Sequence, residues 1–239
     1  MKHLSLLIVL TLIFAISSLA QTGLRDAPPA VPTGSIDLGG RSIRIPAPDN
    51  FTDTMVLFPH IAGRLIASES PLNEVVAVHV TDEILPRLRD REDLDLPFYT
   101  KVSVLKQLKS ADIELSEFQL LAAEFEKQSP GMLQSIVKSG EKGTGERLSQ
   151  HWGGETNLKI GETRTLGYFD KQLHSISSMF LMNLEIFDRP MLILGSMSLV
   201  HVNKRLLFVY VFRITSSGKD QDLVAEFTKA WTSKIIAAN

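Results

Sequence analysis

Two long apolar runs near the C-terminus constrain the fold most strongly. Met191–Val202 and Arg205–Ile214 are rich in branched and aromatic residues, and only Asn203 and Lys204 separate them. A two-residue connection between strands requires positive φ at its central positions, a conformation that asparagine and glycine favour. The spacing therefore predicts an antiparallel hairpin over Leu192–Ile214.

Other short runs upstream also have the composition of strands. A small hairpin is expected where Ile36 and Leu38 alternate before Gly39-Gly40, and Ile43 and Ile45 alternate after it. Pro46 then ends the second strand, because proline donates no hydrogen bond to a ladder. Further strands are predicted at Glu74–Val80, Phe98–Leu105, Thr163–Phe169 and Ser175–Glu185.

Helical periodicity is confined to three segments. The first is predicted to begin with Ser116 as its N-cap, with Gln119 completing a capping box, and the second covers Met132–Lys138. A closing helix is predicted from about Lys219, with a stripe of apolar side chains that packs on the sheet: Leu223, Phe227, Trp231 and Ile235. Hairpins without regularly alternating helices predict an α+β fold, mainly antiparallel sheet.

Residues 1–20 have the pattern of a secretory signal peptide. Lys2 and His3 precede an apolar run, Leu4–Ile16, and Ser18-Leu19-Ala20 provides small residues for cleavage after Ala20. An uncleaved N-terminal anchor is the alternative interpretation, although the run lies at the lower limit for spanning a bilayer. The pattern predicts a periplasmic or secreted protein.

Composition narrows the function classes. After loss of residues 1–20, 24 Lys and Arg stand against 27 Asp and Glu, a formal charge of −3, so no basic surface predicts nucleic-acid binding. The chain has no cysteine, which excludes disulfides, thiolate metal sites and lipidation at a cysteine. Residues 21–34, rich in proline and glycine, are expected to be a flexible linker, followed by one soluble domain, 35–239, with no further membrane span.

Recognisable catalytic motifs are missing from the sequence. The glycine-rich segment Gly140–Gly145 lacks the strand and the Lys-Ser/Thr pair of a phosphate-binding loop. Gly195-Ser196-Met197-Ser198 lies within a predicted strand and lacks the second glycine of a nucleophile elbow. We therefore expect Ser196 and Ser198 to face away from the core.

Histidines provide the remaining candidates for chemistry. His79, His174 and His201 lie on or beside predicted strands, and their convergence with an acid is the form in which a hydrolase-like site is possible. No two histidines after residue 20 are within five residues of each other, so no metal site and no cofactor are predicted. Trp152 and its neighbour His151 are candidates for a ligand or partner surface.

Three segments together resemble a known group of proteins. They are IPAPDNF at Ile45–Phe51, the Asn203-Lys204 turn followed by LLFVYVF, and the closing helix with Trp231 and a terminal Ile-Ala-Ala-Asn. The chain is similar to uncharacterised secreted proteins of Gram-negative bacteria, and the order of its elements is similar to the PsbP-like α/β/α sandwich. The resemblance implies docking to another envelope protein rather than catalysis, and it implies no catalytic residues.

Two functions follow as hypotheses. The first is a non-catalytic periplasmic binding or accessory module, which the predicted export and the missing motifs favour. The second is a periplasmic enzyme, hydrolase-like, with a site assembled from distant histidines and acids.

Overall fold

The computed structural model describes residues 35–89, 96–127, 144, 147, 149, 158–186, 188–215 and 220–239. The predicted signal peptide, the predicted linker and the predicted helix Met132–Lys138 lie outside these residues. All the described residues belong to one compact unit that begins at Pro32.

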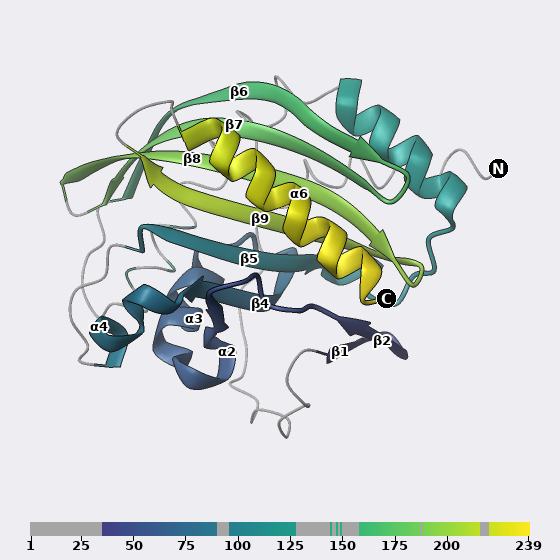
Figure 1. Cartoon of the computed structure of the whole chain (residues 1–239), viewed down its shortest axis with the longest axis horizontal. Coiled ribbons are helices and arrows are strands. Elements are labelled where there is room, and N and C mark those ends of the chain that lie inside the picture. Colours follow the sequence, from purple (N-terminus) through teal and green to yellow (C-terminus); the bar gives the residue numbers. More distant parts are fainter. Residues whose placement is uncertain are drawn as a thin grey trace. The chain divides into compact units, whose positions relative to one another are not determined.

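Antiparallel strands form two sheets (Figure 1). The small sheet is the predicted hairpin of β1 (Ser35–Leu38) and β2 (Arg41–Arg44). The large sheet has the spatial order β3-β4-β5-β9-β8-β7-β6. Its strands in chain order are β3 (Phe51–Asp53), β4 (Asn73–Thr81), β5 (Phe98–Leu105), β6 (Leu158–Gln172), β7 (Ser175–Ile186), β8 (Arg189–Val202) and β9 (Arg205–Thr215).

Both predicted hairpin turns are confirmed. Asn203 and Lys204 have φ values of 46° and 63°, and Gly39 and Gly40 have φ values of 58° and 81°. Positive φ at both central residues is the conformation whose twist matches the two flanking strands. In the first hairpin a Cβ on Gly39 would lie 2.5 Å from the Cα of Ser110, so this position accepts only glycine.

Helices fill the connections between strands and close the chain. The helices between β3 and β5 are α2 (Thr54–Leu57), α3 (Pro59–Ala67), η1 (Asp82–Ile84) and α4 (Leu85–Arg89). A short η2 (Lys106–Leu108) follows β5, a helix occupies residues 115–127, and α6 (Gln221–Ala237) ends the fold. No helix among these residues is long and apolar enough to cross a membrane.

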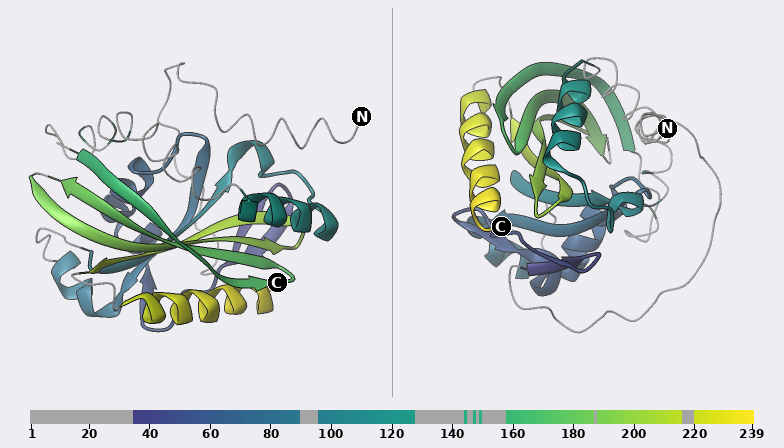
Figure 2. Two further views of the ribbon diagram at one scale, coloured as in Figure 1. Left: turned by 90° about the horizontal axis from the view of Figure 1, so that it is seen from above. Right: turned by 90° about the vertical axis from the view of Figure 1, so that its right-hand side faces the viewer.

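The large sheet lies between two layers of helices (Figure 2). α6 covers one face, mainly over β8 and β9. The helix at residues 115–127 covers the other face, where Phe118 and Ala122 pack on Leu199 and Leu206. The observed architecture is therefore the predicted α+β class, with a small N-terminal hairpin, a large antiparallel sheet and a C-terminal helix.

The start of the helix at residues 115–127 differs from the prediction. Leu115 is already helical, so Ser116 is not the N-cap. Glu117 Oε2 instead accepts a hydrogen bond from the backbone N–H of Glu114, 2.9 Å away. This is the side-chain-to-backbone half of a capping box, displaced by two residues.

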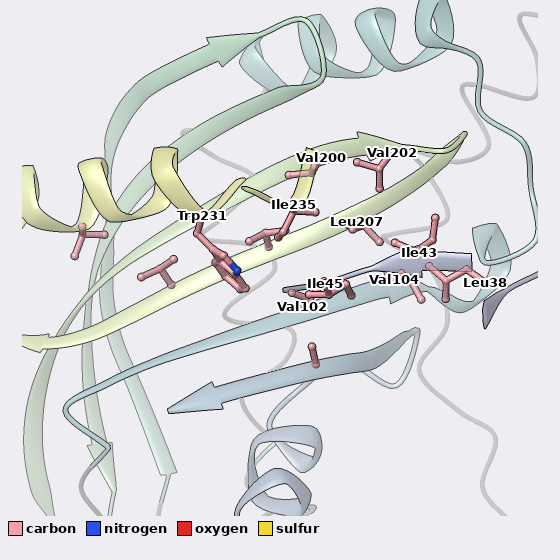
Figure 3. Packing of buried hydrophobic residues seen from close by; sticks show 14 of the residues in the cluster. Leu38, Ile43, Ile45, Val102, Val104, Val200, Val202, Leu207, Trp231 and Ile235 are labelled. Carbon is pink, nitrogen blue, oxygen red and sulfur yellow. The ribbon is translucent and has the colours of Figure 1, made fainter. Parts of the chain in front are cut away.

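The buried side of α6 is also rotated relative to the predicted stripe. Trp231 and Ile235 point from α6 into the main core, as predicted, and Ile43 and Ile45 of the N-terminal segment join the same cluster (Figure 3). Leu223, however, is 43% exposed. The inward positions of the first two turns are occupied by Val224 and Thr228.

Thr228 is buried at a position where its hydroxyl hydrogen-bonds to a serine of the sheet. Ser196 and Ser198 are fully buried, contrary to the expectation that they face away from the core. The hydroxyl of Thr228 donates to the carbonyl of Val224 at 2.6 Å, so Ser196 Oγ donates to Thr228 Oγ1 at 2.7 Å. Ser198 pairs with Ser177 Oγ at 2.7 Å. Burial of these hydroxyls is possible because each has a partner.

The Thr228–Ser196 bond makes a specific prediction about stability. Thr228→Val leaves the buried Ser196 hydroxyl without an acceptor, and we expect it to lower the free energy of unfolding by about 1–3 kcal/mol. Adding Ser196→Ala should recover most of this loss, because both partners are then apolar. Urea denaturation of the two single variants and the double variant measures the coupling. Simple additivity of the two single effects would contradict the role of this bond.

Candidate functional site

An open hollow of about 340 Å³ lies where β3, the end of β4, the start of β5 and the first half of α6 meet. The residues around it are Asp49, Asn50, Phe51, Thr81, Asp82, Glu83, Phe98, Leu223 and Phe227. They come from four separate stretches of the chain, which the sheet and α6 bring together. None of these nine is a histidine, serine or lysine; their functional groups are three carboxylates, one amide and one hydroxyl, and the other four side chains are apolar.

Three phenylalanine rings form the floor of the hollow. Phe98 lies 5.2 Å from Phe51 and 4.8 Å from Phe227 between ring centroids, and the Phe51 and Phe227 centroids are 5.1 Å apart. Edge-to-face and tilted contacts at these separations are favourable between aromatic rings. Leu223 adds an exposed aliphatic side chain one helical turn before Phe227. The result is a preformed apolar surface that is open to solvent.

Carboxylates gather at the rim of the hollow. Asp82 accepts a 2.6 Å hydrogen bond from the Thr52 hydroxyl, which fixes the orientation of its carboxylate. Asp49 forms an ion pair with Lys234 at 2.6 Å. Neither Asp82 nor Glu83 has an ion-pair partner within the described part of the chain. The rim therefore has two negative charges that no cation of these residues neutralises.

A cation does lie on the floor, but a second acid balances it. The Arg213 guanidinium is 5.4 Å from the centroid of the Phe98 ring. Its Nε is also 3.3 Å from a carboxylate oxygen of Asp220, just before α6. The hydrogen bond from Thr215 and the charge of Arg213 lower the pKa of Asp220, so this carboxyl stays ionised. The net negative charge of the hollow therefore comes from Asp82 and Glu83.

His79, the first of the predicted histidines, is a core residue on the face covered by α6. It is 1% exposed, its Nδ1 is 3.0 Å from the Thr100 hydroxyl, and its ring meets Trp231 edge to face at 5.5 Å. Burial lowers its pKa from 6.5 to about 4. His79 is therefore neutral at pH 7 and enclosed by protein.

The other two predicted histidines lie together, far from His79. His174 and His201 approach to 3.4 Å between their Nδ1 atoms, and His201 stacks on Phe118 of the opposite helix layer. Through the register of β5 and β9, His79 of β4 lies level with Ser196 of β8 and on the same face of the sheet. His201 is five residues after Ser196, and because side chains alternate along a strand, it lies on the opposite face. The strands β4 and β8 are themselves roughly 14 Å apart. The fold brings together two of the three histidines.

The remaining sequence candidates fall outside the described residues. Trp152 and His151 are among them, as is most of the segment Gly140–Gly145. Within the described residues, no three His, Asp or Glu side chains are grouped as metal ligands.

Sequence reasoning missed a buried ion pair on the face opposite α6. Lys101 Nζ and Glu69 Oε2 are 2.6 Å apart, and both side chains are at least nine-tenths buried. Burial raises the pKa of Glu69, but the charge of Lys101 and hydrogen bonds from Lys101, Asn73 and Ser70 outweigh it, so the pKa lies below its usual value. Burial, together with the Glu69 charge, raises the pKa of nearby Tyr210. The one sequence signal was a lysine in the middle of an apolar strand.

No family model matches the chain, and no curated protein matches it. The solved structures that match include the Ran-binding protein Mog1p of Saccharomyces cerevisiae and a point mutant of Mog1. Each has 12% sequence identity and a TM-score of 0.31, over 85% of this chain and 92% of the other. A TM-score this low supports no conclusion about family or function.

The neutral, buried state of His79 predicts how stability depends on pH. Its pKa is about 4 in the folded protein and 6.5 in the unfolded chain. Between these values the unfolded chain binds a proton that the folded protein does not, so the free energy of unfolding falls as pH falls from 6.5 to 4. The contribution of His79 to this fall is about 3 kcal/mol.

Urea denaturation at several pH values, on the wild type and on His79→Gln, measures that contribution. We expect His79→Gln to have a shallower slope than the wild type between pH 6.5 and 4. Identical slopes for the wild type and His79→Gln would show that His79 binds its proton equally well in the folded and the unfolded states.

Proposed function

We propose that this protein is an exported, non-catalytic binding module that docks another envelope protein through the hollow described above. The observation that carries the proposal is the combination of a preformed phenylalanine floor with the carboxylates of Asp82 and Glu83. Such a surface suits a partner segment that places an aliphatic or aromatic side chain beside a lysine or arginine. The apolar floor and the acidic rim together favour partner segments in which an apolar side chain stands beside a basic one.

The magnitudes favour a weak and reversible interaction. Burying one large apolar side chain stabilises a complex by about 1.5–3 kcal/mol. Ion pairs at an exposed rim add little affinity, but they raise the association rate and select the sign of the partner's charge. A single anchor with a charged neighbour thus fits a transient accessory contact.

Export is the part of the proposal that rests on the sequence. The basic start, the apolar run and Ser18-Leu19-Ala20 support transport out of the cytoplasm and cleavage before Gln21. A chain without cysteine can fold there without a disulfide-forming system.

The hydrolase alternative has less support. It requires convergence of three histidines with an acid, whereas His79 faces α6 and the other two lie on the opposite face. His201 Nε2 is bonded to the carbonyl of Ile113 rather than to a carboxylate that would orient a catalytic base. We therefore retain the binding module as the proposed function.

Intact-mass measurement of the exported protein tests the first half of the proposal. We expect a chain that begins at Gln21, shorter than the full sequence by residues 1–20. Retention of these residues would instead indicate the anchored alternative, and accumulation of the full-length chain in the cytoplasm would contradict export.

Peptide display on the purified exported protein tests the second half. Selected peptides should share an aliphatic or aromatic residue next to a lysine or arginine. Leu223→Asp, at an exposed position of the hollow, should weaken their binding about tenfold or more. Replacing both rim carboxylates, as Asp82→Asn with Glu83→Gln, should weaken binding at low salt and flatten its salt dependence.

Leu120→Asp is the matched control, because Leu120 is an exposed leucine at 59% on the helix that covers the other face. It should leave peptide binding unchanged. Peptides without the expected pattern, or peptides that bind equally well to Leu223→Asp, would contradict docking at the hollow.

A further inference from the structure

The imidazole rings of His174 and His201 are in direct contact. Their ring centroids are 5.6 Å apart and the ring planes differ by 3°. The Nδ1 atoms are 3.4 Å apart, so the centroid separation exceeds the Nδ1–Nδ1 distance by 2.2 Å, about the width of one imidazole ring. The two rings therefore lie edge to edge with their Nδ1 atoms directed at each other along one line.

Hydrogen bonds fix the protonation pattern of this pair. His201 Nε2 is 2.7 Å from the carbonyl oxygen of Ile113, and a carbonyl only accepts, so His201 carries its proton on Nε2. In the neutral form of His201, its Nδ1 then presents a lone pair, which accepts the hydrogen bond from His174 Nδ1. The backbone N–H of His201 donates to the carbonyl of His174 at 2.8 Å, which holds the two residues side by side.

We propose that this pair is a two-coordinate site for a monovalent coinage-metal ion, Cu(I) or its analogue Ag(I). Such ions favour two nitrogen ligands on opposite sides of the metal, and two collinear Nδ1 atoms provide that arrangement. The ion takes the position of the shared proton. That proton moves to Nε2 of half-buried His174, so both Nδ1 atoms offer a lone pair to the ion and no net proton is released.

The surroundings of His201 suit a ligand. Histidine ligands commonly donate their other N–H to a backbone carbonyl, which orients the ring and increases its basicity, as Ile113 does here. The Phe118 ring covers the face of His201 at 5.3 Å and limits access by water. No carboxylate is bonded to either ring among the described residues, which favours an ion of low charge.

The metal requires a small movement. Two metal–nitrogen bonds of about 2 Å place the nitrogens about 4 Å apart, somewhat more than in the present structure. His201 is only 6% exposed and held by Ile113, whereas His174 lies in the turn before β7 and is half-buried. Rotation of the His174 ring therefore provides the extra distance without disturbing the core.

Titration of the whole exported protein with Ag(I), in chloride-free buffer, tests the site. Native mass spectrometry and calorimetry should show one tightly bound Ag(I) for each chain. Cu(I), supplied under anaerobic conditions against a competing chelator, should bind with the same stoichiometry. In NMR spectra, the imidazole resonances of His174 and His201 should shift on addition of Ag(I), while those of His79 should not.

His174→Asn is the decisive variant, because asparagine Nδ2 takes the place of histidine Nδ1 and still donates to His201 Nδ1, while the second imidazole ligand is lost. We expect it to fold normally and to lose at least 100-fold in Ag(I) affinity; His60→Asn should keep the wild-type affinity. Should His174→Asn fold poorly, the NMR shifts of the wild-type imidazoles decide. Absence of stoichiometric binding, binding unchanged by His174→Asn, or shifts confined to other residues would show that the pair is only a hydrogen bond.

Discussion

Burial of β8 on both faces is the constraint on which the rest of the structure depends. Every residue of this strand from Ile193 to Val202 is buried. A strand in this position needs a layer on each side, which α6 and the helix at residues 115–127 provide. It also needs partners for its polar side chains, because an unpaired buried hydroxyl or imidazole costs about 1–3 kcal/mol. The two helix layers are therefore positioned by polar groups of β8 as well as by apolar contact.

The rotation of α6 shows how this constraint leads to the hollow. Ser196 is satisfied only if Thr228 faces the sheet, so Val224 and Thr228 take the inward positions of the first turns. Leu223 and Phe227 are then turned toward the edge of the helix, where Phe227 meets the other two rings and Leu223 stays exposed. Apolar side chains at the border of the main core thus become the floor and wall of the candidate site.

The sequence predicts the strands and turns of this fold better than it predicts the candidate sites. Apart from the three-residue β3, the strands and both turns follow from local signals, since alternation, β-branching and turn residues act over a few positions. The inward turn of Ser196 and the meeting of His174 with His201 depend on register between strands and on which layer covers which face. No local pattern distinguishes a buried strand serine from an exposed one. The pairing of Lys101 with Glu69 likewise depends on a turn 32 residues earlier.

The two candidate sites are physically independent. The hollow lies on the α6 face beside Arg213, near the end of β9, whereas His201 pairs with Leu206 near the start of that strand and faces the opposite layer. Seven residues of strand separate these points by roughly 23 Å. Coupling between two sites requires an element whose equilibrium both ligands bias, and the described residues offer none beyond the sheet itself. An ion held by the histidines would therefore leave the docking surface unchanged, so the two proposals stand or fall separately.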